Sequence, residues 1–272
     1  DRVLSEAINR PYGMILISGP TGSGKSTTLY AIMQRLNKEG VNIVSLEDPV
    51  EYFMEGANQS QIKPEIGYTF SSGLRQILRQ DPDIIMVGEI RDGETASLAV
   101  NAALTGHVML STIHTNNSVG VIPRFIDLGV PAFLLSSALN LMIAQRLLPS
   151  LCSSCRVKEK APPDLQSIIG EAMAELPEEI MKNLRYEAPY EIYKVEPKTD
   201  CKICKGKGVS GRTVIFEMFK MTKELGNVIS AGATESKLWS EAKRQGIVTL
   251  RQDGILKALE GKVGIEEVMN ET

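Results

Sequence analysis

The chain has 272 residues, 43% of them hydrophobic and 23% charged, and a net charge of −3. Such a length and composition are typical of a globular protein with one large domain, or with one domain and a smaller module. The charge gives no overall attraction to nucleic acid, and no stretch approaches the ~18 apolar residues of a membrane span. We therefore expect a cytosolic protein with no nucleic-acid partner and no transmembrane segment. Because the first residue is Asp1 and not Met, we expect a piece of a longer chain.

A complete phosphate-loop motif, G-x-x-x-x-G-K-S, lies between an apolar run at 14–17 and a helical pattern at 27–38. Glycines let backbone N–H groups turn toward phosphate oxygens, Lys25 adds charge beside the β- and γ-phosphates, and Ser26 offers a hydroxyl to Mg²⁺. The order strand, loop, helix favours nucleoside triphosphate binding over a glycine-rich turn that binds nothing. The predicted cofactor-binding residues are Gly19, Pro20, Thr21, Gly22, Ser23, Gly24, Lys25, Ser26 and Thr27.

Strand and helix patterns alternate along the first 148 residues. We expect helices over 3–9, 69–79 and 94–104, strands over 41–46, 84–87 and 106–116, an irregular segment over 56–67, and a helical pattern over 118–148. Ser71 or Ser72 is the expected N-cap of the helix that reaches Arg79. This alternation predicts an α/β fold with a parallel sheet and helices on both faces.

Acidic and polar residues follow the predicted strands. Glu47 to Glu51 contains three acids after the second strand, Glu89 follows the third, and His114 lies near the carboxyl end of the fourth. Carboxyl ends of parallel strands meet at one edge, where α/β proteins place their chemistry. Glu89 is a candidate for holding Mg²⁺ or its water shell, with Arg91 beside it. A solvated acidic turn is the alternative for Glu47 to Glu51, and His107, at the opposite end of its strand, is expected to be structural.

Arg75 and Arg79 stand four residues apart, so a helix would place them on one face. Surface charge is the simpler interpretation from the residues alone. Contact with phosphate or with a neighbouring subunit is the alternative.

The four cysteines form two C-x-x-C pairs separated by 45 intervening residues. Two such pairs can supply four thiolates to a structural zinc ion, whereas unliganded thiols or a redox pair are the alternatives. The predicted ligands are Cys152, Cys155, Cys201 and Cys204. Between the two cysteine pairs, the segment 164–184 is amphipathic, and the segment 190–195 alternates like an edge strand. After the second pair, we expect a strand over 211–219 and helices over 222–271. We therefore predict a nucleotide-binding core over 1–148, a tetracysteine module with an insertion over 149–210, and a C-terminal strand and helices over 211–272.

Taken together, these motifs resemble those of the ATPases of type II secretion and type IV pilus assembly. The matching segments are GPTGSGKSTTLYA from Gly19, EDPVEY at 47–52, LRQILRQDPDIIMVGEIRD at 74–92, TGHVMLSTIHTN at 105–116, AQRL at 144–147, both C-x-x-C pairs and GRTVIFE at 211–217. The resemblance covers essentially the whole chain.

The resemblance implies a RecA-like ATPase domain that works as a hexamer at the cytoplasmic face of the inner membrane, with ATP between subunits. Its partners would be the inner-membrane platform and adaptor proteins, through which it is peripheral to the membrane. The implied roles are phosphate and Mg²⁺ binding for Lys25 and Ser26, water activation for Glu51, the Mg²⁺ side for Glu89, the histidine box for His114, and links between nucleotide and subunit interface for Arg75, Arg79 and Arg91. The resemblance thus favours function over surface charge for Arg75 and Arg79.

Three rival functions stay open at the level of the sequence. A pilus-retraction motor is disfavoured by the cysteine pairs, which the resemblance associates with assembly and secretion. A DNA-translocating or conjugative ATPase is disfavoured by the net charge and by the lack of an aromatic and basic strip. A nucleotide-binding scaffold without turnover is disfavoured by the two acids at strand ends, Glu51 and Glu89.

Overall fold

The chain divides into two compact units in a computed structural model that describes residues 2–182, 184 and 186–272. Unit 1 comprises Asp1–Ala144 and Met218–Gln245, and unit 2 comprises Gln145–Glu217 and Gly246–Thr272. The boundaries of these compact units differ from those of the three regions expected from the sequence motifs. The division into 1–148, 149–210 and 211–272 therefore stays a prediction.

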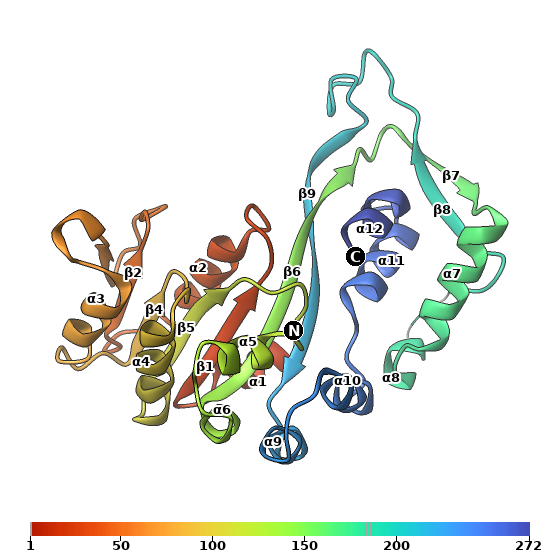
Figure 1. The fold of residues 1–272 in the computed structure, drawn as a ribbon. Coiled ribbons are helices and arrows are strands. Elements are labelled where there is room, and N and C mark those ends of the chain that lie inside the picture. Colours follow the sequence, from red (N-terminus) through yellow and green to blue (C-terminus); the bar gives the residue numbers. More distant parts are fainter. Residues whose placement is uncertain (1, 183, 185) are drawn as a thin grey trace. The chain divides into compact units, whose positions relative to one another are not determined.

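A seven-stranded sheet in the order β3-β2-β4-β5-β1-β6-β9 organises the fold, with helices alongside it (Figure 1). Its strands are β1 Gly13–Ser18, β2 Ile43–Glu47, β3 Ala57–Gln61, β4 Ile84–Val87, β5 Val108–Ile113, β6 Leu139–Leu151 and β9 Val209–Lys220. The pairings from β3 through β6 are parallel. Every residue of β1, β2, β4 and β5 is buried, as expected for parallel strands covered on both faces. The predicted α/β class is confirmed.

The helices of unit 1 lie where the sequence patterns predict them, except that the helical pattern expected over 118–148 stops at residue 138. They are α1 Arg2–Ile8, α2 Lys25–Leu36, α3 Phe70–Ile77, α4 Gly93–Leu104, α5 Val121–Asp127, α6 Ala132–Ala138, α9 Lys223–Ser230 and α10 Glu235–Arg244, with a 3₁₀ turn η1 at Pro64–Ile66. Leu29, Ile32 and Met33 bury one face of α2.

Two local predictions were wrong. The helical pattern ends at Ala138, and the next thirteen residues form β6, a strand that lies between β1 and β9 and is buried through Gln145 and Arg146. The N-cap of α3 is Thr69, not Ser71 or Ser72, because the Thr69 hydroxyl accepts from the Ser72 backbone N–H while Ser72 Oγ accepts from the Thr69 N–H. These reciprocal bonds form a capping box.

Unit 2 holds a small antiparallel pair, β7 Arg156–Lys160 with β8 Glu191–Val195. Its helices are α7 Pro163–Ala174, α8 Glu178–Met181, α11 Leu250–Leu259 and α12 Ile265–Glu271. The edge strand expected over 190–195 is present as β8, and the amphipathic segment expected over 164–184 corresponds to α7 and α8, with residue 183 outside the described residues. Among the described residues, no helix combines the length and the apolar character needed to span a bilayer.

Candidate nucleotide site and metal centre

The phosphate loop connects the end of β1 to the start of α2. Gly22 and Gly24 have positive φ angles of 79° and 84°, which side-chain-bearing residues rarely adopt. A Cβ built on Gly22 meets no atom within 4 Å, so the loop is open at this point. Lys25 Nζ donates to the carbonyl oxygens of Gly19 at 3.0 Å and Pro20 at 2.9 Å, which places the ammonium over the loop. With the positive N-terminal end of α2 behind it, this arrangement fits a phosphate chain.

The other candidate side chains follow strands that are neighbours of β1. The sheet register pairs Ser18 with Ile113, Ser111 with Val87, and Val87 with Leu46. The segments after β1, β5, β4 and β2 therefore leave the sheet at the same edge. This is the edge at which open α/β sheets bind their ligands.

Glu89, Arg91 and His114 form a cluster at this edge. Arg91 Nη2 lies 2.5 Å from Glu89 Oε1, and His114 Nε2 lies 3.6 Å from Glu89 Oε2. The Glu89 side chain is only 14% exposed, against 69% for Arg91 and 49% for His114. The Glu89 carboxylate and the Ser26 hydroxyl, in the first turn of α2, are the hard oxygen donors that Mg²⁺ prefers.

Hydrogen bonds between β4 and β5 hold the Glu89 segment beside His114. Thr112 Oγ1 donates to the Gly88 carbonyl at 2.7 Å, and the Ile90 N–H donates to the Thr112 carbonyl at 2.9 Å. Asp92, which accepts from the Thr95 N–H at 2.8 Å, then caps α4 and fixes where the chain turns after Arg91.

The remaining predicted residues are not part of this cluster. Glu51 lies exposed in the loop after β2. Arg75 forms an ion pair with Glu94 in the first turn of α4. Arg79 is exposed and lies beyond the C-cap of α3, Leu78, so the two arginines do not share a face of one helix. His107 bonds through Nδ1 to the Ala102 carbonyl at 2.9 Å at the end of α4, a structural role.

The sequence reasoning missed a buried polar network around Glu47. The Glu47 carboxylate is 3% exposed and accepts hydrogen bonds from Tyr30, Ser45 and Gln59. Tyr30 belongs to α2, and Gln59 belongs to β3, so neither is close to Glu47 in sequence. The available signal was an acidic residue directly after the apolar run of β2, in a position that a strand buries.

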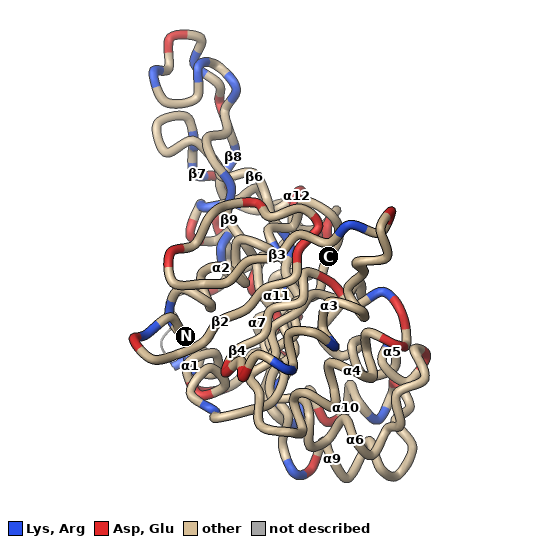
Figure 2. Tube along the Cα trace, turned by 90° about the vertical axis from the view of Figure 1, so that its left-hand side faces the viewer, with Lys and Arg blue, Asp and Glu red and all other residues tan. Residues whose placement is uncertain are grey.

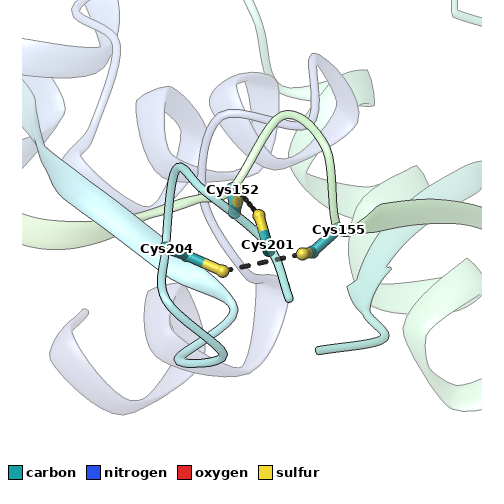
Figure 3. Close-up of side chains that lie close together, drawn as sticks. All are labelled: Cys152, Cys155, Cys201 and Cys204. Atoms are coloured by element: carbon teal, nitrogen blue, oxygen red, sulfur yellow. Dashed lines mark hydrogen bonds between the residues drawn. The ribbon is translucent and has the colours of Figure 1, made fainter. Parts of the chain in front are cut away.

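The four cysteines converge in unit 2, as Figure 3 shows. All four are buried and free of disulfides, and their sulfur atoms lie within 4.8 Å of one another. Cys152 Sγ is 3.7 Å from Cys201 Sγ, and Cys155 Sγ is 3.6 Å from Cys204 Sγ. A tetrahedral zinc site with Zn–S bonds of about 2.3 Å has sulfur–sulfur edges of about 3.8 Å, so the donor set fits zinc. Backbone N–H groups of Cys204 and Ile203 lower the pKa of Cys201 to about 6, which favours a thiolate there, whereas burial and hydrogen bonds to the other three thiols raise the pKa of Cys155 to about 12.

A parallel sheet with a phosphate loop between β1 and α2 defines the class of P-loop nucleotide-binding proteins. Residues 1–270 match the family model described as "Type II/IV secretion system protein". The chain belongs to this family, and the relationship expected from the motifs is confirmed.

Two curated relatives show how far the similarity extends. The chain is 43% identical over 267 residues to the type IV pilus assembly ATPase PilB of Myxococcus xanthus, covering 98% of the chain and 45% of PilB. It is 40% identical over 271 residues to the type II secretion system protein E of Pseudomonas aeruginosa, covering 100% of the chain and 51% of that protein. The chain thus spans about half the length of these relatives.

The fold is also similar to a solved motor structure. The crystal structure of the pilus retraction motor PilT with bound ADP matches at a TM-score of 0.69 and 27% identity, covering 100% of this chain and 64% of that one.

Proposed function

We propose that the chain is the ATP-hydrolysing part of a motor that powers type IV pilus assembly or type II protein secretion. The observation that carries the proposal is a complete phosphate loop with Glu89 and Glu51 after neighbouring parallel strands, in a chain of this family. Its curated relatives are named for those two machines.

The proposed reaction is in-line attack of water on the γ-phosphorus of ATP, in which positioning and charge stabilisation supply most of the catalysis. Lys25 binds the phosphates, and Glu51 orients the water or accepts its proton. Mg²⁺, held through Ser26 and Glu89, supplies charge neutralisation when bound. His114 and Arg91 hold the Glu89 carboxylate in place.

Arg75 and Arg79 are proposed to act between subunits. Both are exposed, and Arg79 has no ion pair among the described residues. An exposed guanidinium that faces a neighbouring active site could stabilise charge on its phosphates. The proposal therefore includes a homo-hexamer at the cytoplasmic face of the inner membrane, together with platform and adaptor partners.

The tetracysteine cluster is proposed to hold structural zinc. Because all four positions of the ion are filled by thiolates, the centre has no open position for catalysis. Its task is to join the segment after β6 to the segment before β9.

A retraction motor is the second candidate, and the similarity to PilT favours it. Identity to the assembly and secretion relatives is higher, at 43% and 40% against 27%. The cysteine cluster also favours assembly or secretion. DNA translocation gains no support, because Figure 2 shows Lys and Arg interspersed with Asp and Glu along the trace.

ATP hydrolysis by the Lys25→Ala variant tests the proposal. We expect the parent protein to release phosphate from ATP only with Mg²⁺, and the variant to lose at least about 99% of this rate because the phosphate charge is no longer matched. The measurement is phosphate release over a range of protein concentrations, since sites between subunits gain activity as the ring assembles.

Lys38→Ala is the matched control, because Lys38 is an exposed lysine just beyond the other end of α2. It should hydrolyse ATP at the parent rate. Equal hydrolysis by Lys25→Ala and the parent would refute the proposed function.

A further inference from the structure

The buried carboxylate of Glu47 lies between the phosphate-loop helix and the loop that carries Glu51. Tyr30, which is 7% exposed on α2, donates its hydroxyl hydrogen to Glu47 Oε2. Ser45 Oγ donates to Glu47 Oε1 at 2.5 Å, and Gln59 Nε2 donates to the same oxygen at 3.2 Å. Each carboxylate oxygen therefore has a partner, as a buried polar group requires.

The same side chains hold the segment just after β2. Gln59 Nε2 donates to the Tyr52 carbonyl at 3.0 Å, and Gln59 Oε1 accepts from the Met54 N–H at 2.7 Å. Gln59 Nε2 also donates to the Tyr30 hydroxyl oxygen at 3.2 Å, and the backbone of Tyr52 and Glu51 lies near enough to that oxygen to act on the pKa of Tyr30. The rings of Tyr30 and Tyr52 also pack edge to face, with centroids 5.0 Å apart.

A further hydrogen bond connects the C-terminal end of α2 to the same loop. Asn37 Nδ2, at the C-cap of α2, donates to the Glu55 carbonyl at 2.7 Å. One helix thus begins with the phosphate-binding Lys25 and Ser26 and fixes the loop after β2 at two further points. Burial and the bond to Glu47 raise the pKa of Tyr30 from 10.0 to about 12, which extends the pH range over which its hydroxyl donates to Glu47.

We propose that Tyr30, Glu47 and Gln59 are positioning residues, which set the distance of the Glu51 carboxylate from the nucleotide bound at the start of α2. This role rests on the proposed function, because it acts through Glu51. A rigid link of this kind matters because a displacement of about 1 Å at a reacting group costs up to about a hundredfold in rate. A purely structural network would affect stability alone.

The test is a double-mutant cycle between Tyr30→Phe and Glu51→Gln in the intact protein. Removing the Tyr30 hydroxyl takes away the bonds to Glu47 and Gln59 that hold the loop around Glu51. We therefore expect kcat to fall roughly tenfold while the dissociation constant for ATP changes less than about twofold. In the Glu51→Gln background, Tyr30→Phe should change kcat less than about twofold, because the group that it positions is already gone.

Amide hydrogen exchange supplies a readout that does not depend on turnover. Exchange of residues 51–54 should accelerate in Tyr30→Phe and also in Gln59→Met, which keeps the side-chain length but loses the amide. Gln59→Met changes a partly exposed residue and is expected to fold even if Tyr30→Phe does not.

Tyr68→Phe is the matched control, because Tyr68 shares a hydrogen bond of 2.8 Å with Ser60 of β3 and has no bond to the network. It should leave kcat and the exchange of 51–54 at parent values. Unchanged kcat in Tyr30→Phe and Gln59→Met, or equal losses in both backgrounds of the cycle, would overturn the positioning role alone. A parent without Mg²⁺-dependent hydrolysis would instead overturn the proposed function.

Discussion

Glu51 is an exposed carboxylate in the loop that follows β2, and it has no ion pair among the described residues. The proposed mechanism assigns it the proton of the attacking water. Glu51→Gln keeps the shape of the side chain but removes its basicity. We expect hydrolysis at least about tenfold slower with unchanged ATP binding, measured by phosphate release and by equilibrium binding.

Glu55→Gln is the control for this prediction, because it makes the same substitution four residues further along the same loop, where the exposed side chain is assigned no role. The control should hydrolyse ATP at the parent rate. If Glu51→Gln were as fast as Glu55→Gln, Glu51 would not be the base.

At the scale of single residues, the sequence predicted which candidate residues strand order brings to one edge of the sheet; their roles stay a prediction. Lys25 and Ser26 sit in a contiguous motif, and Glu89 and His114 follow adjacent parallel strands. Tyr30 and Gln59 could not be predicted, because their contact with Glu47 brings α2, β2 and β3 together in three dimensions. No local pattern in the sequence records such a contact.

Among the elements, α3 depends on its capping box at Thr69. Thr69→Ala removes the hydroxyl that accepts from the Ser72 N–H and should lower the free energy of unfolding of unit 1 by about 1 kcal/mol. Urea denaturation followed by circular dichroism measures this change.

Thr234→Ala provides the comparison, since Thr234 is the N-cap of α10 but makes no side-chain capping bond. Its effect on the urea midpoint should be less than half that of Thr69→Ala. Equal shifts would show that the capping bond at Thr69 contributes nothing.

The elements that sequence patterns predicted correctly are the buried strands and most helices. The pattern failed for β6, because a strand covered on both faces is a continuous apolar run, and Leu139, Met142 and Ile143 also have helical spacing. The segment 56–67 was left irregular because β3, an edge strand, is polar and only partly buried. Burial, which decides both cases, is a property of the assembled sheet.

For the molecule as a whole, the tetracysteine cluster uses every cysteine in the chain. We expect about one zinc ion per chain by metal analysis of carefully purified protein. Chelation should lower the unfolding temperature of unit 2, because the metal-binding free energy contributes to its folding.

Cys201→Ser is the matched variant, which removes one of the four ligands. It should bind zinc more weakly and show a smaller stability change on chelation than the parent. Less than half an equivalent of zinc in the parent protein would argue against the metal centre.

The chain passes between the two compact units at three places, near residues 144, 217 and 245. Met218–Gln245, which includes α9 and α10, therefore belongs to the unit with the phosphate loop but is translated after most of unit 2. When residue 144 has left the ribosome, the whole nucleotide-binding motif has been synthesised, but α9 and α10, which complete its unit, have not. The phosphate-loop unit can reach its final fold only late in synthesis, and a stop codon at position 145 would leave it unfinished.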